Sequence, residues 1–299
     1  MSVIEKDALD QVKADTEKII DDVAAVKVSA DNAANKTGYG EYIDDEIVEI
    51  PDNFFDMRNN PFLLIKVSFN NAVNIGDNAF NNCMRLVEIN IPKAETLGTS
   101  CFLNCTSIIN MNLSLIKEVG ENCFQNCYNL ETISLPLVEN IPTNCFYVCK
   151  KLKTVELSAV KSIGNSAFSS CVSLESLNLP NATSIGYSSL YQCTGLKTLN
   201  LPLVETIDSY GIRHCNSIEK IDLPVIKSLG ERCFLDCTSL KKVVIRTSSL
   251  CTAASDIFYG ISPTPNIYVP DNLVSQYKKA SNWSSYASYI KPLSEYVEE

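Results

Sequence analysis

The sequence predicts a solenoid, in which short repeated units stack into one elongated domain. Eight cysteines recur every 22 residues without a slip, from Cys83 to Cys237. A phenylalanine column, an aliphatic column and two charge columns follow the same interval. A unit of this length is too small to bury its own apolar face, so each unit must stack on its neighbours.

The composition fits a large folded protein that binds neither nucleic acid nor membranes. Of the 299 residues, 45% are hydrophobic and 20% are charged, which is enough for an extended core. The net charge of −10 disfavours polyanions, because phosphates attract Lys and Arg patches. No run of 18 apolar residues occurs, so we expect no membrane insertion. Residues 1–15 lack the basic start and apolar stretch of a secretion signal, so we expect none in this chain.

Residues 1–35 are predicted to form an N-terminal helix and a candidate coiled coil. Their apolar positions alternate at spacings of three and four, as in a heptad seam. The expected oligomerisation residues are Leu9, Val12, Ile19, Val23 and Val26. Branched residues at Ile19 and Val26 favour a trimeric homo-oligomer over a dimer. The alternatives are docking to a larger assembly through 1–35 and a helix that packs on its own solenoid. Residues 36–44 are a predicted linker.

Residues 45–265 are predicted to form the solenoid. Each unit contains a short strand pattern, as in Leu130–Pro136. Ile133 and Leu135 alternate with Thr132 and Ser134, so the first two point inward and the others outward. Successive strands should lie side by side, about 4.8 Å apart. Proline ends five of these strands and stops the sheet there, at Pro92, Pro136, Pro180, Pro202 and Pro224.

Glycine and charge columns support the same repeat. The glycine column predicts a turn with positive φ, which glycine adopts without steric cost. It contains Gly76, Gly98, Gly120, Gly164, Gly186 and Gly230. Glu and Lys alternate in each charge column, as in Glu131 and Lys153, so opposite charges should pair between neighbouring units. Such exposed pairs specify stacking order more than they stabilise.

Residues 266–299 are predicted to form a C-terminal cap, because the last unit of a solenoid otherwise exposes its core. A closing helix is expected over Asp271–Leu293, with Asp271 as its N-cap. An aromatic segment follows the start of that helix, with Tyr277, Trp283, Tyr286 and Tyr289. The alternative interpretation is an aromatic platform that binds sugar.

The thirteen cysteines are interpreted as buried, reduced core residues. Four C-x-x-x-C pairs suggest metal at first sight, but Ala, Ser or Gly fills the partner column elsewhere, so small size is the shared property. These partners are Ala79, Ala167, Ser189 and Gly211. His214 is the only histidine, and no phosphate-binding loop, dinucleotide fingerprint or H-E-x-x-H motif occurs. We therefore expect no enzyme, catalytic residue, metal or cofactor, and synthesis in a reducing cytoplasm.

Two surfaces are candidate binding sites. The outward side chains of the strands form a polar sheet that suits hydrogen bonds to a glycan or protein, although it is equally a plain solvated face. Its candidate residues are Asn110, Thr132, Thr154, Asn178, Thr198 and Asn200. The second site lies where Leu190 and Ile212 interrupt the phenylalanine column. Residue types that dominate binding energy gather there, namely Tyr187, Tyr191, Tyr210, Arg213 and His214. The alternative is that degenerate repeats tolerate tyrosine on a turn.

The repeat resembles the BspA-like leucine-rich repeats. The resemblance lies in the pattern L-x-x-I-x-L-P followed by I-G-x-x-A/C-F-x-x-C, as in Leu174–Pro180 and Ile163–Cys171, and covers about residues 45–270. It implies a leucine-rich repeat solenoid with short parallel strands and an irregular or β convex side. Family members are adhesins and surface antigens, and similar chains occur in phage tail regions. The resemblance thus implies binding to a protein or glycan on a cell surface.

Three functional hypotheses follow for a non-enzymatic protein. The first is a phage tail-associated or receptor-binding virion component, which agrees with reduced cysteines and an oligomerising N-terminal helix. The second is a cellular adhesin of the BspA type. The third is a structural scaffold within a larger assembly. The expected location is accordingly a virion or a cell surface.

Overall fold

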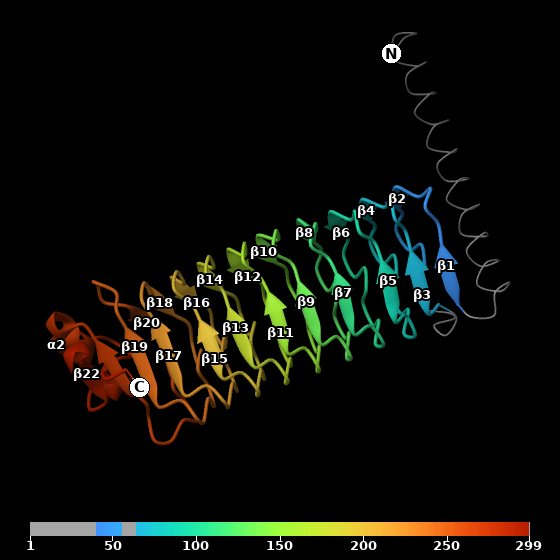
Figure 1. The fold of residues 1–299 in the computed structure, drawn as a ribbon. Coiled ribbons are helices and arrows are strands. Elements are labelled where there is room, and N and C mark those ends of the chain that lie inside the picture. Colours follow the sequence, from blue (N-terminus) through green and yellow to red (C-terminus); the bar gives the residue numbers. More distant parts are fainter. Residues whose placement is uncertain (1–39, 56–63, 299) are drawn as a thin grey trace, which may run out of the picture.

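Each unit forms one rung of an elongated parallel solenoid, as the sequence predicts. The computed structural model describes residues 40–55 and 64–298. Figure 1 shows the rungs stacked in chain order, with neighbouring strands pointing the same way. The predicted helix over 1–35 and its oligomerisation residues Leu9, Val12, Ile19, Val23 and Val26 lie outside the described residues.

A long strand begins each rung, and these strands form the strand face. They are β1 (Glu41–Ile43), β3 (Lys66–Ser68), β5 (Glu88–Asn90), β7 (Asn110–Asn112), β9 (Thr132–Ser134), β11 (Thr154–Glu156), β13 (Ser176–Asn178), β15 (Thr198–Asn200), β17 (Lys220–Leu223), β19 (Lys242–Ile245), β21 (Asn266–Val269) and β22 (Ile290–Pro292). Ile133 is 4% exposed and Leu135 is fully buried, whereas Thr132 is exposed, which confirms the predicted alternation. β1 lies within the range 36–44 that the sequence analysis assigned to a linker, and it pairs with β3.

A two-residue strand forms the opposite side of each rung. These strands are β2 (Glu49–Ile50), β4 (Asn74–Ile75), β6 (Thr96–Leu97), β8 (Glu118–Val119), β10 (Asn140–Ile141), β12 (Ser162–Ile163), β14 (Ser184–Ile185), β16 (Thr206–Ile207), β18 (Ser228–Leu229) and β20 (Thr252–Ala253). Their sheet is divided between β8 and β10. On either side of this break, the amides of Gly120 and Gly164 donate to the preceding rung. Pro142 occupies the equivalent position between them and has no N–H to donate.

The predicted reason for the glycine column is wrong. The column glycines do not have positive φ, which among described glycines occurs at Gly40 and Gly260. They are required by close packing instead. A Cβ on Gly120 would lie 2.3 Å from the Thr99 nitrogen of the preceding rung. Glycine is therefore present because two backbones approach too closely for a side chain.

Positive φ occurs at two other positions of each rung from β3 to β20, on the turn side that follows the short strand. In the third rung these are Ser100 and Asn104, with φ of 55° and 61°. Asparagine fills many of these positions, because its short polar side chain tolerates the left-handed region. The turn sides also stack by backbone hydrogen bonds, such as Phe80 N–H to Cys101 C=O at 2.9 Å.

The core is a set of continuous side-chain columns. Phe80, Phe102, Phe124, Phe146 and Phe168 stack with ring centroids 5.0–5.7 Å apart and nearly parallel planes. Leu190 and Ile212 interrupt the stack but are fully buried, so these two rungs keep a closed core.

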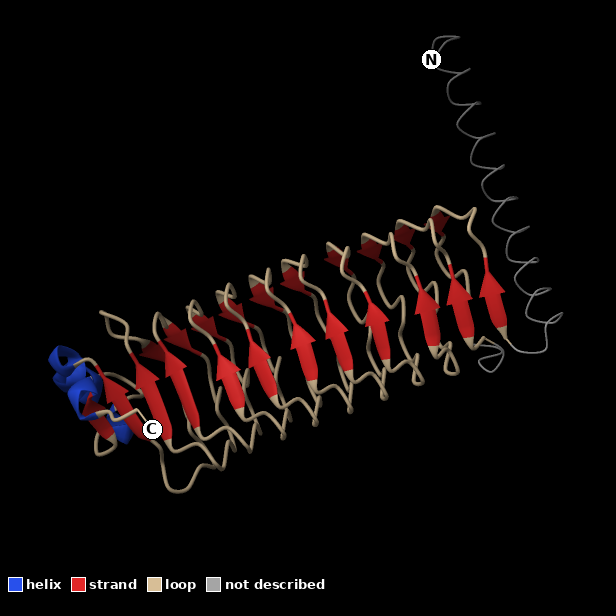
Figure 2. Ribbon diagram, in the orientation of Figure 1, coloured by secondary structure: helices blue, strands red, loops and turns tan. Residues whose placement is uncertain are grey.

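Residues 270–298 fold over the last rungs, where Figure 2 shows helix. The structure differs from the predicted long helix. α2 spans only Val274–Lys279, between the 3-10 turns η1 (Asp271–Leu273) and η2 (Ser284–Tyr286), with η3 (Leu293–Glu295) after β22. Asp271 is not an N-cap, because its carboxylate accepts the backbone N–H of Ser294. Trp283 is 1% exposed, and its indole N–H donates to the carbonyl of Cys251 at 2.7 Å.

Candidate functional site

The five residues of the predicted second site lie together on the turn side of two successive rungs, and we call them the tyrosine cluster. Tyr187 and Tyr210 meet edge to face, with centroids 5.7 Å apart. The Arg213 guanidinium lies over the rings of Tyr191 and Tyr210, at 4.9 and 5.6 Å from their centroids. The rings of Tyr191 and His214 are 5.6 Å apart. Three of these four contacts join neighbouring rungs, and that of Arg213 with Tyr210 lies within one rung, so the stacking of rungs assembles the cluster.

The left-handed positions of the turn present these side chains outward. Tyr210 and His214 have φ of 60° and 57°, at positions that asparagine fills in earlier rungs. Tyr187 follows Gly186 and is 49% exposed. The core beneath contains the buried Leu190 and Ile212, so the core is filled without the aromatic side chains of the cluster.

Four further residues extend the cluster, and the sequence analysis missed them. His214 Nε2 lies 3.5 Å from an oxygen of Asp236. The pKa of Arg232 is raised, chiefly by its hydrogen bond with Tyr210. Arg232 also pairs with Asp256 at 3.4 Å and lies over the ring of Tyr259 at 5.4 Å. Asp236 and Arg232 stand one repeat, 22 residues, after His214 and Tyr210. That spacing was the signal in the sequence that identifies both.

The predicted strand-face residues are all exposed and form two separate groups. Asn110, Thr132 and Thr154 lie directly opposite one another on β7, β9 and β11. Asn178, Thr198 and Asn200 lie on β13 and β15, where Asn200 donates to the Asn178 amide oxygen at 2.6 Å. The second group lines a hollow of about 640 Å³ that Lys197 and Glu219 also border. The face is a regular polar sheet that includes charged residues such as Glu156 on β11, and none of the described residues that line the hollow is aromatic.

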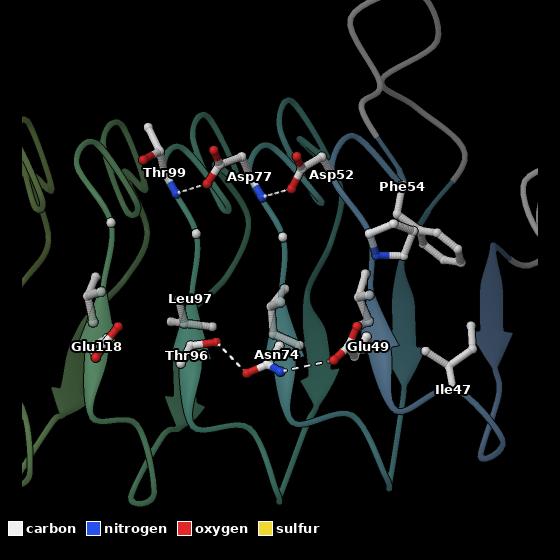
Figure 3. Close-up of a pocket in the computed structure, with 17 residues that line it drawn as sticks. Ile47, Glu49, Asp52, Phe54, Asn74, Asp77, Thr96, Leu97, Thr99 and Glu118 are labelled. Carbon is white, nitrogen blue, oxygen red and sulfur yellow. Dashed lines mark hydrogen bonds between the residues drawn. The ribbon is translucent and has the colours of Figure 1, made fainter. Parts of the chain in front are cut away.

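A larger hollow lies elsewhere, along the short strands β2, β4, β6 and β8 at the N-terminal end. Figure 3 shows this groove of about 720 Å³. On one side the carboxylate of Asp52 accepts the N–H of Asp77 at 2.7 Å, and that of Asp77 accepts the N–H of Thr99 at 2.6 Å. The apolar floor is nearly inaccessible, since Ile75 and Leu97 are each 2% exposed. The groove thus results from side chains that link rungs, and we do not assign a ligand to it.

The cysteine column has a structural role that small size alone does not explain. Each thiol of the column donates to a backbone carbonyl of the preceding rung, as Cys149 does to Phe124 at 3.1 Å and Cys171 to Phe146 at 3.1 Å. All thirteen cysteines are buried and unpaired. Burial raises the pKa of Cys193 to about 12. A thiol with such a pKa is protonated at neutral pH and is a poor nucleophile or metal ligand.

Within residues 40–55 and 64–298, no group of three or more His, Cys, Asp or Glu side chains is arranged to hold a metal ion. In the same part of the chain, no helix has the length and apolar character needed to cross a membrane.

Comparison with known proteins identifies the repeat. A family model described as BspA type leucine-rich repeat region matches residues 48–174 and 161–287, in 6 copies. No curated protein matches the sequence.

Solved structures with similar folds are distant in sequence. A leucine-rich cell surface protein from Faecalibacterium prausnitzii is 17% identical with a TM-score of 0.42, over 77% of this chain and 87% of that one. The pneumococcal vaccine antigen PcpA is 18% identical with a TM-score of 0.48, over 85% and 78%. A leucine-rich repeat protein of T. pallidum is 21% identical with a TM-score of 0.43, over 60% and 78%.

Proposed function

The chain belongs to the BspA-type leucine-rich repeat family, and we propose that it is a non-enzymatic protein that binds a ligand on a cell surface. The tyrosine cluster is the observation that supports this proposal. Tyrosine and arginine dominate binding energy at protein surfaces. Here they contact one another on the surface of two rungs whose core is complete without them.

The finer proposal is a phage tail-associated or receptor-binding component of a virion. The cysteines support it. Thirteen free thiols lie in the core, and those of the cysteine column donate hydrogen bonds between rungs, so oxidation would break the stack. Such a protein is expected to fold in a reducing compartment such as a cytosol, which agrees with assembly of a phage component inside its host cell.

A cellular adhesin of the BspA type is the second candidate. Family membership favours it, because BspA-like leucine-rich repeat proteins are surface and adhesion-type proteins. The proposed binding site is the same in both cases.

Oligomerisation through residues 1–35 remains part of the proposal. Light scattering of the full chain is expected to give a trimer, or a larger complex with an assembly partner. Replacement of Ile19 and Val26 by Asp should give a monomer. A wild-type monomer would reject the coiled coil and weaken the virion proposal.

An array of cell-surface glycans and proteins tests the binding function. The full chain is compared with two triple variants, one with Tyr187, Tyr191 and Tyr210 changed to Ser, the other with Asn110, Thr132 and Thr154 changed to Ala. We expect binding that the first variant loses and the second retains. The reverse result would move the site to the strand face. A wild-type chain that binds nothing on the array or on cells would reject a binding function and favour a scaffold.

A further inference from the structure

The tyrosine cluster contains a cation without a counter-charge. Arg213 has no ion pair with a carboxylate in the described part of the chain, where Arg232 pairs with Asp256 and Arg246 with Asp222. The Nε atom of Arg213 is buried and has no hydrogen-bond partner. Within the described residues, the specific side-chain contacts of Arg213 are those of its guanidinium group with the faces of Tyr191 and Tyr210.

Three carboxylates of the next rungs contact side chains other than Arg213. Asp236 lies 3.5 Å from His214, and Asp256 lies 3.4 Å from Arg232. Glu231 lies 3.7 Å from Arg232. Within residues 40–55 and 64–298, Arg213 therefore has no ion-pair partner, in a chain whose net charge is −10.

The two tyrosine rings hold the guanidinium before any ligand arrives. The cluster contacts place it between rings of successive rungs, at 4.9 and 5.6 Å from their centroids. An arginine fixed in this way loses little conformational freedom on binding. Its remaining N–H groups form a planar fork, which matches the two oxygens of a carboxylate.

The exposed ring of Tyr187 provides the second part of the site. It is 49% exposed and lies edge to face against Tyr210. A tyrosine ring combines a flat apolar face with a polar hydroxyl group. A sugar ring has the same two-sided character, with C–H groups on its faces and hydroxyls at its rim.

We propose that the tyrosine cluster binds a carboxylate-bearing saccharide, with Arg213 as the anion-binding residue and Tyr187 packing on the sugar ring. This inference rests on the proposed function and names the ligand class of its site. Arg213 donates to both carboxylate oxygens, and the ligand supplies the ion-pair partner that Arg213 does not have within the described part of the chain.

Calorimetric titration of the full chain tests the proposal. The probes are tetragalacturonate, a sialylated trisaccharide and the methyl ester of each, which keeps the sugar and removes the charge. The wild type should bind at least one acid roughly tenfold or more tightly than its ester, as expected for a charged hydrogen-bonded pair. Arg213→Gln should remove this preference, so that acid and ester bind with equal affinity. Equal affinity for acid and ester, or binding to none of the four probes, would overturn the proposal.

Three controls separate the possible outcomes. Arg246→Gln removes an arginine that is also stacked on tyrosine but is paired with Asp222, and it should leave the acid preference intact. Thermal unfolding verifies that each variant is folded. A tetraglutamate peptide that binds as tightly as the acidic sugars, with the same dependence on Arg213, would overturn the saccharide assignment. Array binding to neutral glycans alone, with no acidic glycan bound, would reject this inference while the proposed function stands.

Discussion

At the scale of single residues, the left-handed turn positions impose the most specific demand on the sequence. Asparagine meets it in the early rungs, where Asn104 and Asn126 also link their amide groups at 2.8 Å. Val148 occupies such a position with φ of 62°, where a β-branched side chain is strained. The backbone of the repeat therefore keeps the same conformation even where one residue disfavours it.

Val148→Asn should raise the free energy of unfolding by about 1 kcal/mol, because asparagine tolerates the left-handed region that valine resists. Urea unfolding measures the change. Val172→Asn is the matched control, since Val172 is an exposed valine that is not among the positive-φ residues. Equal effects of the two substitutions would contradict the backbone explanation.

Gly120→Ala should destabilise the chain by about 2 kcal/mol or more, because the added methyl group meets backbone that cannot move aside. Its Cβ would lie 2.3 Å from the Thr99 nitrogen. Gly211→Ala is the control, as Ala79 and Ala167 fill the equivalent position of other rungs. This change should alter the free energy of unfolding by less than about 1 kcal/mol. A tolerated Gly120→Ala, seen by thermal unfolding, would refute the close-packing explanation.

At the scale of elements, the charge columns behave as predicted. Lys153 lies 2.8 Å from Glu131, and Lys117 lies 2.7 Å from Glu95 in the second column. All the side chains in these pairs remain substantially exposed, so solvent and salt screen the interaction. The pairs thus fix the order of rungs and add little stability.

Lys153→Gln should raise the pKa of Glu131 toward its ordinary value. The hydrogen bond between Glu131 and Lys153 is the largest cause of the lowered pKa of Glu131. A carboxyl group whose pKa is lowered in the folded state stabilises the fold at neutral pH. This contribution is lost as the pH falls through the pKa of the folded state, below about pH 4. NMR titration of the Glu131 carboxyl measures the shift. Lys151→Gln is the control, because Lys151 is the smallest cause. Equal shifts in both variants would contradict the pairing.

At the scale of the whole molecule, the repeat made the fold predictable. Each column of repeated residues has its own fixed place in the rung, so the core and the strand alternation could be predicted from the 22-residue period. The reason for the glycine column and the thiol hydrogen bonds did not follow. Both depend on how closely neighbouring rungs approach, which a column of residue types does not specify. The prediction of one long closing helix was wrong for a related reason. The residues of this segment are positioned by contacts with the last rungs, such as that of Trp283 with Cys251.

The cysteines provide a prediction for the whole chain. All thirteen thiols should react with a thiol reagent after denaturation, and almost none in the native state, because burial shields them from the reagent. A denatured count clearly below thirteen, without added reductant, would contradict a core of free thiols and the reducing compartment proposed for folding.

Hydroxyl-radical footprinting of the full chain, with and without a ligand found on the array, tests the central claim that the solenoid binds through the tyrosine cluster. We predict that oxidation of Tyr187, Tyr191 and Tyr210 decreases when the ligand is bound. Tyr128, a distant tyrosine that is 39% exposed, should be oxidised equally in both samples. Protection of the strand face with no change at these three tyrosines would contradict the account.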